Sequence, residues 1–461
     1  MSKAKNNKAT DNQKAKSSLW AAFLGFFVDM FDVYLPIVAL GPAMVYFQPK
    51  DLPATVTVTI YYVVFAISLI GRPLGAAIFG HYADKIGRKK TTLISIAGFG
   101  VGTLLIGLLP GYEQIGIWAI VLLILLRFVD GIFLGGEYTA ASPLAMENSP
   151  HEKRGLYSGI ILAGFPAAYV SISLVTATVM FFVPIGDASS PYVMWGWRIP
   201  FFIGALLAFA YVIYFSKHAS ESDLWLEGQN ENADNKVNAA KEASPLKELF
   251  KGESGRNFLQ VFVLMSGIWF TFNSIASALP GILTNYLKIS GTTVTSGLLI
   301  INVILIFTYI LGGMISQKVG RKPFLVTMGL ITTVIGTVLY FNVIRLAVDN
   351  IVLALTIAGI MQVLCMSVWG AVTAYITERF KTGVRASGFG LGYSLAVIIP
   401  SCYSFIMLGL ANFMPYQYTP VVLLGVGGIL TVIGAAWGPE TRDVLFHEEG
   451  STSIDQKKLH A

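Results

Sequence analysis

LWAAFLGFFVDMFDVYLPIVALGPAMVYF, residues 19–47, is an apolar run long enough to cross a bilayer, and it carries two acids near its middle. These acids are Asp29 and Asp32, about one helical turn apart. An acid at bilayer depth costs roughly 2.5 kcal/mol or more unless it faces a cavity or a partner. The stretch therefore predicts a membrane-spanning helix beside a polar interior, which is typical of a transporter.

The rest of the chain repeats this apolar pattern. Of its 461 residues 54% are hydrophobic and 13% charged, and the mean hydropathy is +0.66. Soluble domains usually contain about 25% charged residues, and in lipid each span must satisfy its own backbone hydrogen bonds as a helix. We predict an all-α membrane protein with twelve spans, at residues 19–47, 57–81, 91–110, 115–142, 156–183, 196–215, 257–287, 294–317, 322–345, 350–377, 384–410 and 418–437.

Positive charge is distributed unevenly between the connections. Twenty-six of the 32 Lys and Arg fall in the two tails and in the loops after even-numbered spans. By the positive-inside rule, both termini are predicted to be cytosolic. The predicted parts are an N-terminal tail (1–18), a six-helix bundle (19–215), a cytosolic linker (216–256), a second six-helix bundle (257–437) and a C-terminal tail (438–461).

The two bundles carry related loop sequences. GHYADKIGRKK, residues 80–90, follows the second span, and GMISQKVGRK, residues 313–322, follows the eighth. Such repeats are typical of transporters built from two similar halves.

In the first loop, Gly80 and Gly87 permit a tight turn and a close approach of helices. Asp84 can bind a cation or the N-terminus of another helix. Arg88 and Lys89 can form ion pairs across the interface between the halves. The alternative is that the cations only keep the loop cytosolic.

Four acids within spans are candidates for proton coupling: Asp29, Asp32, Asp130 and Glu137. Two acids one turn apart can hold a proton and release it when water or a cation arrives, and Asp32 is the favoured site. Arg127, Asp130 and Glu137 share one helical stripe. The structural alternative is a set of fixed ion pairs with Arg72 or Arg127.

Several residues are candidates for substrate binding. A guanidinium at bilayer depth can hold a carboxylate through two hydrogen bonds, or it can only neutralise a nearby acid. Neutral and aromatic side chains could orient a substrate, although such groups also join helices to one another. The candidates are Arg72, Arg127, Tyr34, Asn273, Trp369 and Tyr393.

The motifs carry a family likeness. The loop pattern G-x-x-x-D-x-x-G-R-K at 80–89 and RFVDGIFLGGE at 127–137 resemble signatures of the major facilitator superfamily. Within it, ENSPHEKRG (147–155), WGWRIPF (195–201) and RASGFG (385–390) resemble the metabolite:proton symporters. The resemblance implies import of small carboxylates, betaines or shikimate-like acids with protons. It also implies a gate that closes the inner face, involving the first loop motif with Arg154 and Arg321.

The chain departs from that pattern at three places. Asp130 stands where the family usually has Gln, and Gln317 replaces the acid of the second loop. The first span reads D-M-F-D at 29–32 where the family commonly has E-W-Y-D. The form in this chain more closely resembles that of the aromatic-acid and sialic-acid transporters of the superfamily.

No sequence pattern indicates catalysis. The five His fall in loops and tails without metal-ligand spacing, and no phosphate-binding Gly-rich motif occurs. We expect a bacterial inner-membrane symporter, monomeric in the lipid bilayer, that binds a small-molecule substrate and protons, no nucleic acid and no cofactor, and uses the proton gradient. The alternatives are a proton-driven exporter, an ion channel, or a non-transporting sensor on the same fold.

Overall fold

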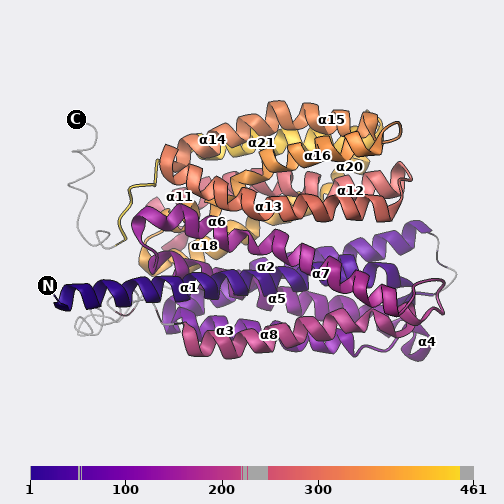
Figure 1. The fold of residues 1–461 in the computed structure, drawn as a ribbon, viewed down its shortest axis with the longest axis horizontal. Coiled ribbons are helices and arrows are strands. Elements are labelled where there is room, and N and C mark those ends of the chain that lie inside the picture. Colours follow the sequence, from indigo (N-terminus) through magenta and orange to yellow (C-terminus); the bar gives the residue numbers. More distant parts are fainter. Residues whose placement is uncertain are drawn as a thin grey trace.

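Long helices run side by side across the molecule in the computed structural model, which describes residues 2–49, 52, 54–219, 221, 226 and 248–446 (Figure 1). No strand occurs among these residues. In the part of the chain that the structure describes, twelve helices are long and apolar enough to cross a membrane, with lengths from 20 to 35 residues. The predicted all-α fold with twelve spans is confirmed.

The elements of the first half are α1 (Ser2–Leu35), η1 (Pro36–Leu40), η2 (Gly41–Phe47), α2 (Ala54–Ile86), α3 (Arg88–Gly107), α4 (Tyr112–Ile115), α5 (Trp118–Glu147), η3 (His151–Lys153), α6 (Arg154–Leu162), α7 (Gly164–Phe182), η4 (Tyr192–Gly196) and α8 (Arg198–His218).

The elements of the second half are α11 (Gly252–Phe272), η5 (Asn273–Ala278), α12 (Leu279–Gly281), η6 (Ile282–Tyr286), α13 (Gly291–Val319), α14 (Arg321–Ile331), η7 (Thr332–Gly336), α15 (Thr337–Leu346), α16 (Ile351–Met366), η8 (Ser367–Ala371), α17 (Val372–Glu378), η9 (Thr382–Val384), α18 (Arg385–Ser394), η10 (Leu395–Val397), α19 (Ile398–Ser401), α20 (Tyr403–Leu410), η11 (Tyr416–Tyr418) and α21 (Thr419–Trp437).

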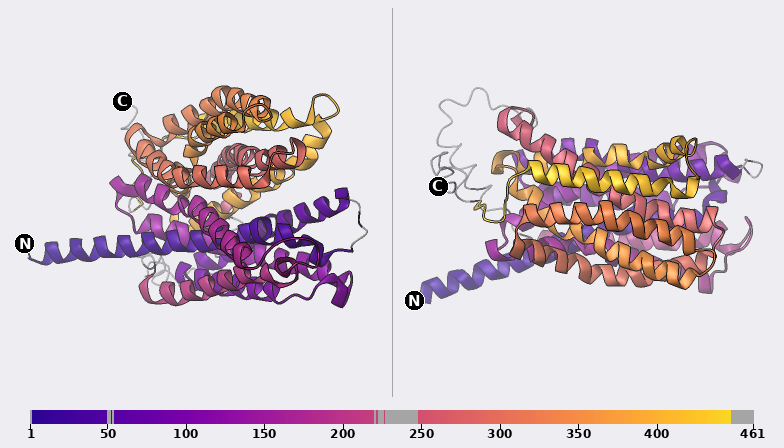
Figure 2. Two further views of the ribbon diagram at one scale, coloured as in Figure 1. Left: turned by 45° about the vertical axis from the view of Figure 1, so that its right-hand side comes forward. Right: turned by 90° about the horizontal axis from the view of Figure 1, so that it is seen from above.

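The two halves lie against each other along their length (Figures 1 and 2). Helix α1 begins and α21 ends at the same end of the molecule, called here the terminal end. At this end α2 packs on α18, and α6 packs on α13. Helix α1 starts at Ser2 and projects beyond the bundle (Figure 2), so it includes residues that the sequence analysis assigned to a polar tail.

The surface and the interior have the polarity expected of a membrane protein. Large apolar side chains such as Leu206, Phe307 and Val338 are more than half exposed on the outside of the bundle. Charged side chains such as Asp29 and Arg127 are fully buried inside it. Lipid tails can solvate the first group but not the second, which explains this arrangement.

Reciprocal glycines bring α2 and α5 into close contact. A Cβ atom at Gly75 would collide with the backbone of Ile132, and one at Gly135 would collide with the backbone of Arg72. A Cβ at Gly131 would likewise meet the backbone of Ser68. This approach places side chains of the two helices within reach of each other, as small residues do in membrane helix pairs.

The two halves share a backbone feature at the repeated loop. Gly87, between α2 and α3, has φ 105° and ψ 150°, and Gly320, between α13 and α14, has φ 102° and ψ 151°. Side chains other than hydrogen are strained there, so glycine is favoured. The sequence repeat therefore reflects a repeated structure.

Replacing Gly131 with Leu should force α2 away from α5, because its side chain would occupy the backbone position of Ser68. We expect a loss of about 1–3 kcal/mol in the free energy of unfolding, as for overpacked cores. Thermal melting in detergent measures it. Gly409→Leu is the control, since a Cβ there meets no atom within 4 Å; equal melting of the two variants would contradict the prediction.

Candidate functional site

The first buried ion pair joins α1 to α2. Asp29 Oδ1 lies 2.6 Å from Arg72 Nη2, and both side chains are almost completely buried. Neither Asp29 Oδ2 nor Arg72 Nε has a hydrogen-bond partner among the described residues. Each group therefore retains hydrogen-bonding capacity while it is paired.

A second cluster centres on Arg127 of α5. Its Nη1 lies 2.9 Å from Asp32 Oδ2 and 2.7 Å from Asp130 Oδ2. Its Nη2 donates to Ser68 Oγ at 3.1 Å, and Thr103 Oγ1 donates to the other oxygen of Asp32 at 2.5 Å. One cation thus compensates two acids from different helices.

Glu137 stands apart from this cluster. It is 1% exposed, and neither carboxyl oxygen has a hydrogen-bond partner among the described residues. It lies beside Gly25 and the hydroxyl of Tyr211, which itself donates to the Ala21 carbonyl at 2.5 Å. The structure therefore joins only Arg127 and Asp130 from the predicted stripe, while Glu137 faces α1 and α8.

Acids outnumber cations in this half of the interior. The four predicted acids and the two arginines, Arg72 and Arg127, are each at most 3% exposed. If every group were ionised, the set would carry two excess negative charges. Buried charge without compensation is costly, so such a set favours uptake of a cation or a proton.

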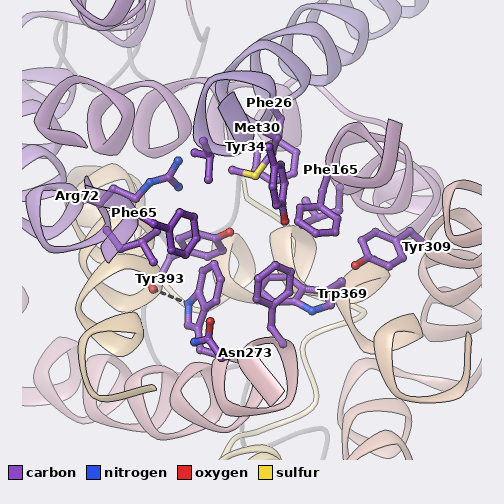
Figure 3. A pocket seen from close by; sticks show the side chains of 15 residues that line it. Phe26, Met30, Tyr34, Phe65, Arg72, Phe165, Asn273, Tyr309, Trp369 and Tyr393 are labelled. Carbon is purple, nitrogen blue, oxygen red and sulfur yellow. Dashed lines mark hydrogen bonds between the residues drawn. The ribbon is translucent and has the colours of Figure 1, made fainter. Parts of the chain in front are cut away.

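A cavity lies between the halves, and Arg72 is one of the residues that line it (Figure 3). Through its ion pair with Arg72, Asp29 lies next to this cavity. The region that the cavity occupies contains about 490 Å³ of space not filled by atoms, open solvent included, and nine of its fifteen lining residues are aromatic. The lining residues are Phe26, Met30, Val33, Tyr34, Phe65, Leu69, Arg72, Leu162, Phe165, Trp269, Phe272, Asn273, Tyr309, Trp369 and Tyr393. Arg72 is the only charged member of this set.

The structure brings together five of the six predicted substrate residues at this cavity: Tyr34, Arg72, Asn273, Trp369 and Tyr393. The sixth, Arg127, does not line it and is instead enclosed by its two acids. Sequence reasoning missed most of the aromatic residues of the wall, because aromatic side chains are frequent throughout the spans. Their convergence depends on how the two halves pack.

The cavity wall contains several hydrogen-bond donors without partners. Asn273 Nδ2, Trp369 Nε1 and the Tyr309 hydroxyl have none among the described residues. Trp269 Nε1, in contrast, donates to the Tyr393 carbonyl at 3.0 Å. Buried polar atoms usually have partners, so these donors fit a ligand rich in acceptor oxygens.

A smaller compartment of about 350 Å³ adjoins the cavity and shares Tyr34 and Phe165 with it. The rings of these two residues are 5.4 Å apart between centroids and contact edge to face. Gln362 lines the compartment, and its Nε2 has no partner among the described residues.

The smaller compartment lies farther from the terminal end than the main cavity. On α13 it is lined by Leu305 where the main cavity is lined by Tyr309, and on α16–η8 by Met366 where the main cavity is lined by Trp369. We therefore call it the outer compartment.

Contacts between the halves close the terminal end. Asp84 of α2 accepts hydrogen bonds from the N-terminus of α18, at 3.2 Å from Ala386 N, 3.0 Å from Ser387 N and 2.7 Å from Ser387 Oγ. Glu147 of α5 lies 2.6 Å from Arg385 of α18 and also pairs with Arg88. A carboxylate at a helix N-terminus is stabilised by the helix dipole.

The second half forms a related contact with an uncharged residue. Gln317 Oε1 accepts from Gly155 N, at the start of α6, at 2.8 Å, and from Arg321 Nη2 at 2.7 Å. Gln317 therefore takes the place that Asp84 has in the first half. Arg321 also pairs with Glu378 at 3.3 Å.

Two glutamates cap the helices after the repeated loops. Glu221 accepts from the backbone N–H groups of Arg88 and Lys89 at 3.1 and 3.0 Å. Glu440 accepts from those of Arg321 and Lys322 at 2.8 and 3.1 Å.

All the predicted gating residues lie at or next to these contacts. Gly80 approaches Ser387, Gly87 forms the turn, Arg88 donates to the Thr382 carbonyl at 3.3 Å and Arg154 donates to the Val444 carbonyl at 2.6 Å. The partners Glu147, Arg385, Glu378 and Glu440 were not predicted as site residues. Glu147 and Arg385 lie inside the motifs ENSPHEKRG and RASGFG, which was the available signal for these two residues.

A cavity enclosed between two six-helix halves, bordered by buried charge and closed at one end by contacts between the halves, defines a membrane transporter of small molecules. The profile of the sugar (and other) transporter family matches residues 1–449, and the chain belongs to this family of the major facilitator superfamily. The predicted superfamily is therefore confirmed. The family is one of transporters.

Similar proteins agree with this assignment. A candidate metabolite transport protein of Haemophilus influenzae is 30% identical over 448 residues, which cover 93% of this chain and 97% of that protein. The proline/betaine transporter of Escherichia coli K12 is 29% identical over 439 residues, covering 92% of this chain and 84% of that protein. The structure of the proton:xylose symporter XylE bound to 6-bromo-6-deoxy-D-glucose superposes with a TM-score of 0.75 at 19% identity, covering 95% and 99% of the two chains.

Replacing Arg127 with Met should destabilise the protein, because Asp32 and Asp130 would remain buried without their cation. We expect a loss of about 3–5 kcal/mol, measured as a lower midpoint in thermal melting. The further change Asp130→Asn should recover part of the loss.

Arg345→Met is the matched control, since Arg345 is exposed at the end of α15. If Arg127→Met and Arg345→Met melted alike, the cluster would contribute nothing to folding.

Proposed function

We propose that the protein is a secondary active transporter that imports a small organic acid or a zwitterionic metabolite together with protons by alternating access. The observation that carries the proposal is the Asp29–Arg72 pair, 2.6 Å long, which joins the buried acids to the cavity. No cofactor enters the scheme, because the proton gradient supplies the energy.

The pair suggests how proton and substrate are coupled. Protonation of Asp29 removes the charge that holds Arg72, and the freed guanidinium can then bind a substrate carboxylate through two hydrogen bonds. Loss of the proton on the other side restores the pair and displaces the substrate. The Asp29 carboxylate and the substrate carboxylate therefore compete for one arginine, and a proton on Asp29 favours the substrate, which couples the movement of proton and substrate.

The cavity wall supports a ligand with one anionic and one apolar or cationic part. Arg72 and the unpartnered donors Asn273 Nδ2 and Trp369 Nε1 fit carboxylate or hydroxyl oxygens. Trp269 and Trp369, with ring centroids 5.0 Å apart, add aromatic surface to the same cavity. Aromatic faces pack on apolar rings and also attract cations, so the wall accommodates cyclic acids and zwitterions.

The remaining acids provide further protonation sites in this proposal. Asp32 and Asp130 share one cation, and Glu137 has no partner among the described residues, so a proton on any of them reduces the charge imbalance. Sequence reasoning favoured Asp32. The contact of Asp29 with a cavity residue supports Asp29 as the acid that senses the substrate.

We also propose that the terminal end faces the cytosol of a bacterium and that the protein lies in the inner membrane as a monomer. The distribution of 26 of the 32 Lys and Arg supports this orientation. With this orientation, the contacts made by Asp84, Glu147 and Gln317 close the protein on its cytosolic side.

A first test measures coupling directly. A thermal-shift screen of carboxylates, betaines and cyclic acids identifies a ligand, since ligands stabilise the state that they bind. In proteoliposomes an inward proton gradient should then drive accumulation of that ligand, and Asp29→Asn should abolish accumulation while exchange across the membrane continues. Asp187→Asn, which alters an exposed acid between α7 and η4, is the control.

Uphill accumulation by Asp29→Asn would remove Asp29 from the mechanism. Extrusion of the ligand under the same gradient would show an exporter, and binding without any flux would show a sensor.

A second test concerns the gate. Asp84→Asn removes the charge that caps α18, and hydrogen bonds to a charged group are worth about 1.5–3 kcal/mol. We expect a cysteine placed at Thr139, which is buried against Gly390 of the other half, to react at least about tenfold faster with a soluble maleimide. Asp443→Asn at the same end is the control, and Cys402→Ser removes the exposed native thiol. Unchanged reactivity at Thr139→Cys would show that Asp84 does not hold this end closed.

A further inference from the structure

The chain that follows α21 returns to the interface between the halves. Phe446 is 3% exposed although it lies outside every span. Its ring centroid is 3.5 Å from Cζ of Arg154 and 4.2 Å from Cζ of Arg385. Arg154 starts α6 in the first half, and Arg385 starts α18 in the second half.

The backbone beside Phe446 makes a further contact with the first half. Arg154 Nη1 donates to the Val444 carbonyl at 2.6 Å. Upstream, the same segment is fixed to the second half, where Glu440 caps α14 and Thr441 Oγ1 donates to Glu378 at 2.7 Å. Residues 438–446 therefore begin attached to the second half and end in contact with both halves.

The two arginines make the contact of Phe446 sensitive to the conformation of the whole protein. A guanidinium within about 6 Å of a ring centroid is attracted to the face of that ring, most strongly where water is excluded. When the halves separate at the terminal end, Arg154 and Arg385 move apart, since each belongs to a different half. Phe446 can then stay with one of them at most.

We propose that the Val444 carbonyl and the Phe446 ring form a clasp that stabilises the state closed at the terminal end, with the ring bound between the guanidinium groups of Arg154 and Arg385. Removal of the clasp shifts the protein toward the state open at that end. The proposal rests on alternating access as proposed above, but it assigns control of one step to a segment outside the spans, separate from the proton and substrate sites.

Distances between spin labels test the clasp without a substrate or a gradient. The labels are attached at Lys85→Cys in the first half and Lys381→Cys in the second, both exposed at the terminal end, in a Cys365→Ala, Cys402→Ser background. Phe446→Leu keeps an apolar side chain of similar size but removes the aromatic face. We expect about a fivefold rise in the population with the longer distance.

Two matched variants separate the ring contact from simple loss of packing. Phe446→Tyr retains the aromatic face and should keep the native distance distribution. Leu445→Ala changes a neighbouring side chain that is 43% exposed, and should also keep it. A native distribution for Phe446→Leu would overturn the clasp, as would an equal shift caused by Leu445→Ala.

Failure of the transport proposal gives a different result. If Asp29→Asn still accumulates substrate while Phe446→Leu opens the terminal end, the coupling scheme is wrong and the clasp stands.

Discussion

The ion pair between Asp29 and Arg72 is the interaction on which the rest of the structure depends. Both groups are buried at the depth of the spans, where neither would be stable alone. The pair requires α1 and α2 to stay in register, and the glycine contacts between α2 and α5 bring the Arg127 cluster alongside. A polar network inside an apolar bundle is thus held by close backbone packing.

The two halves have similar architecture but different chemistry. The first half supplies the buried acids and both arginines of the network, whereas the second supplies Trp269, Asn273, Trp369 and Tyr393 to the cavity. The terminal end shows the same asymmetry, since a charged Asp84 caps α18 while a neutral Gln317 caps α6. Buried charge therefore lies on the first-half side of the cavity, whereas the lining residues from the second half are all uncharged.

Sequence patterns predicted this organisation well where a pattern has one structural cause. Apolar runs about 20 residues long predicted the spans, because the bilayer fixes their length. The repeated loop motif predicted the repeat, since Gly87 and Gly320 need the same positive φ. Five of the six substrate candidates line the cavity; Arg72 and Asn273 could be singled out because charged and amide side chains are rare at bilayer depth. Glu137 shows what helical periodicity cannot predict. It shares a face of α5 with Arg127, but that face does not tell which helices pack against Glu137, and in the structure these are α1 and α8.

The sequence by itself determined that this chain spans a membrane twelve times in two related halves, with acids and arginines buried within the first. These properties follow from local composition and from the cost of polar groups in lipid. Only the tertiary structure decided which acid meets which arginine, which aromatic rings enclose the cavity and where Phe446 lies. Each of these depends on residues far apart in the chain, and their distances are set by how helices pack and not by the order of the residues.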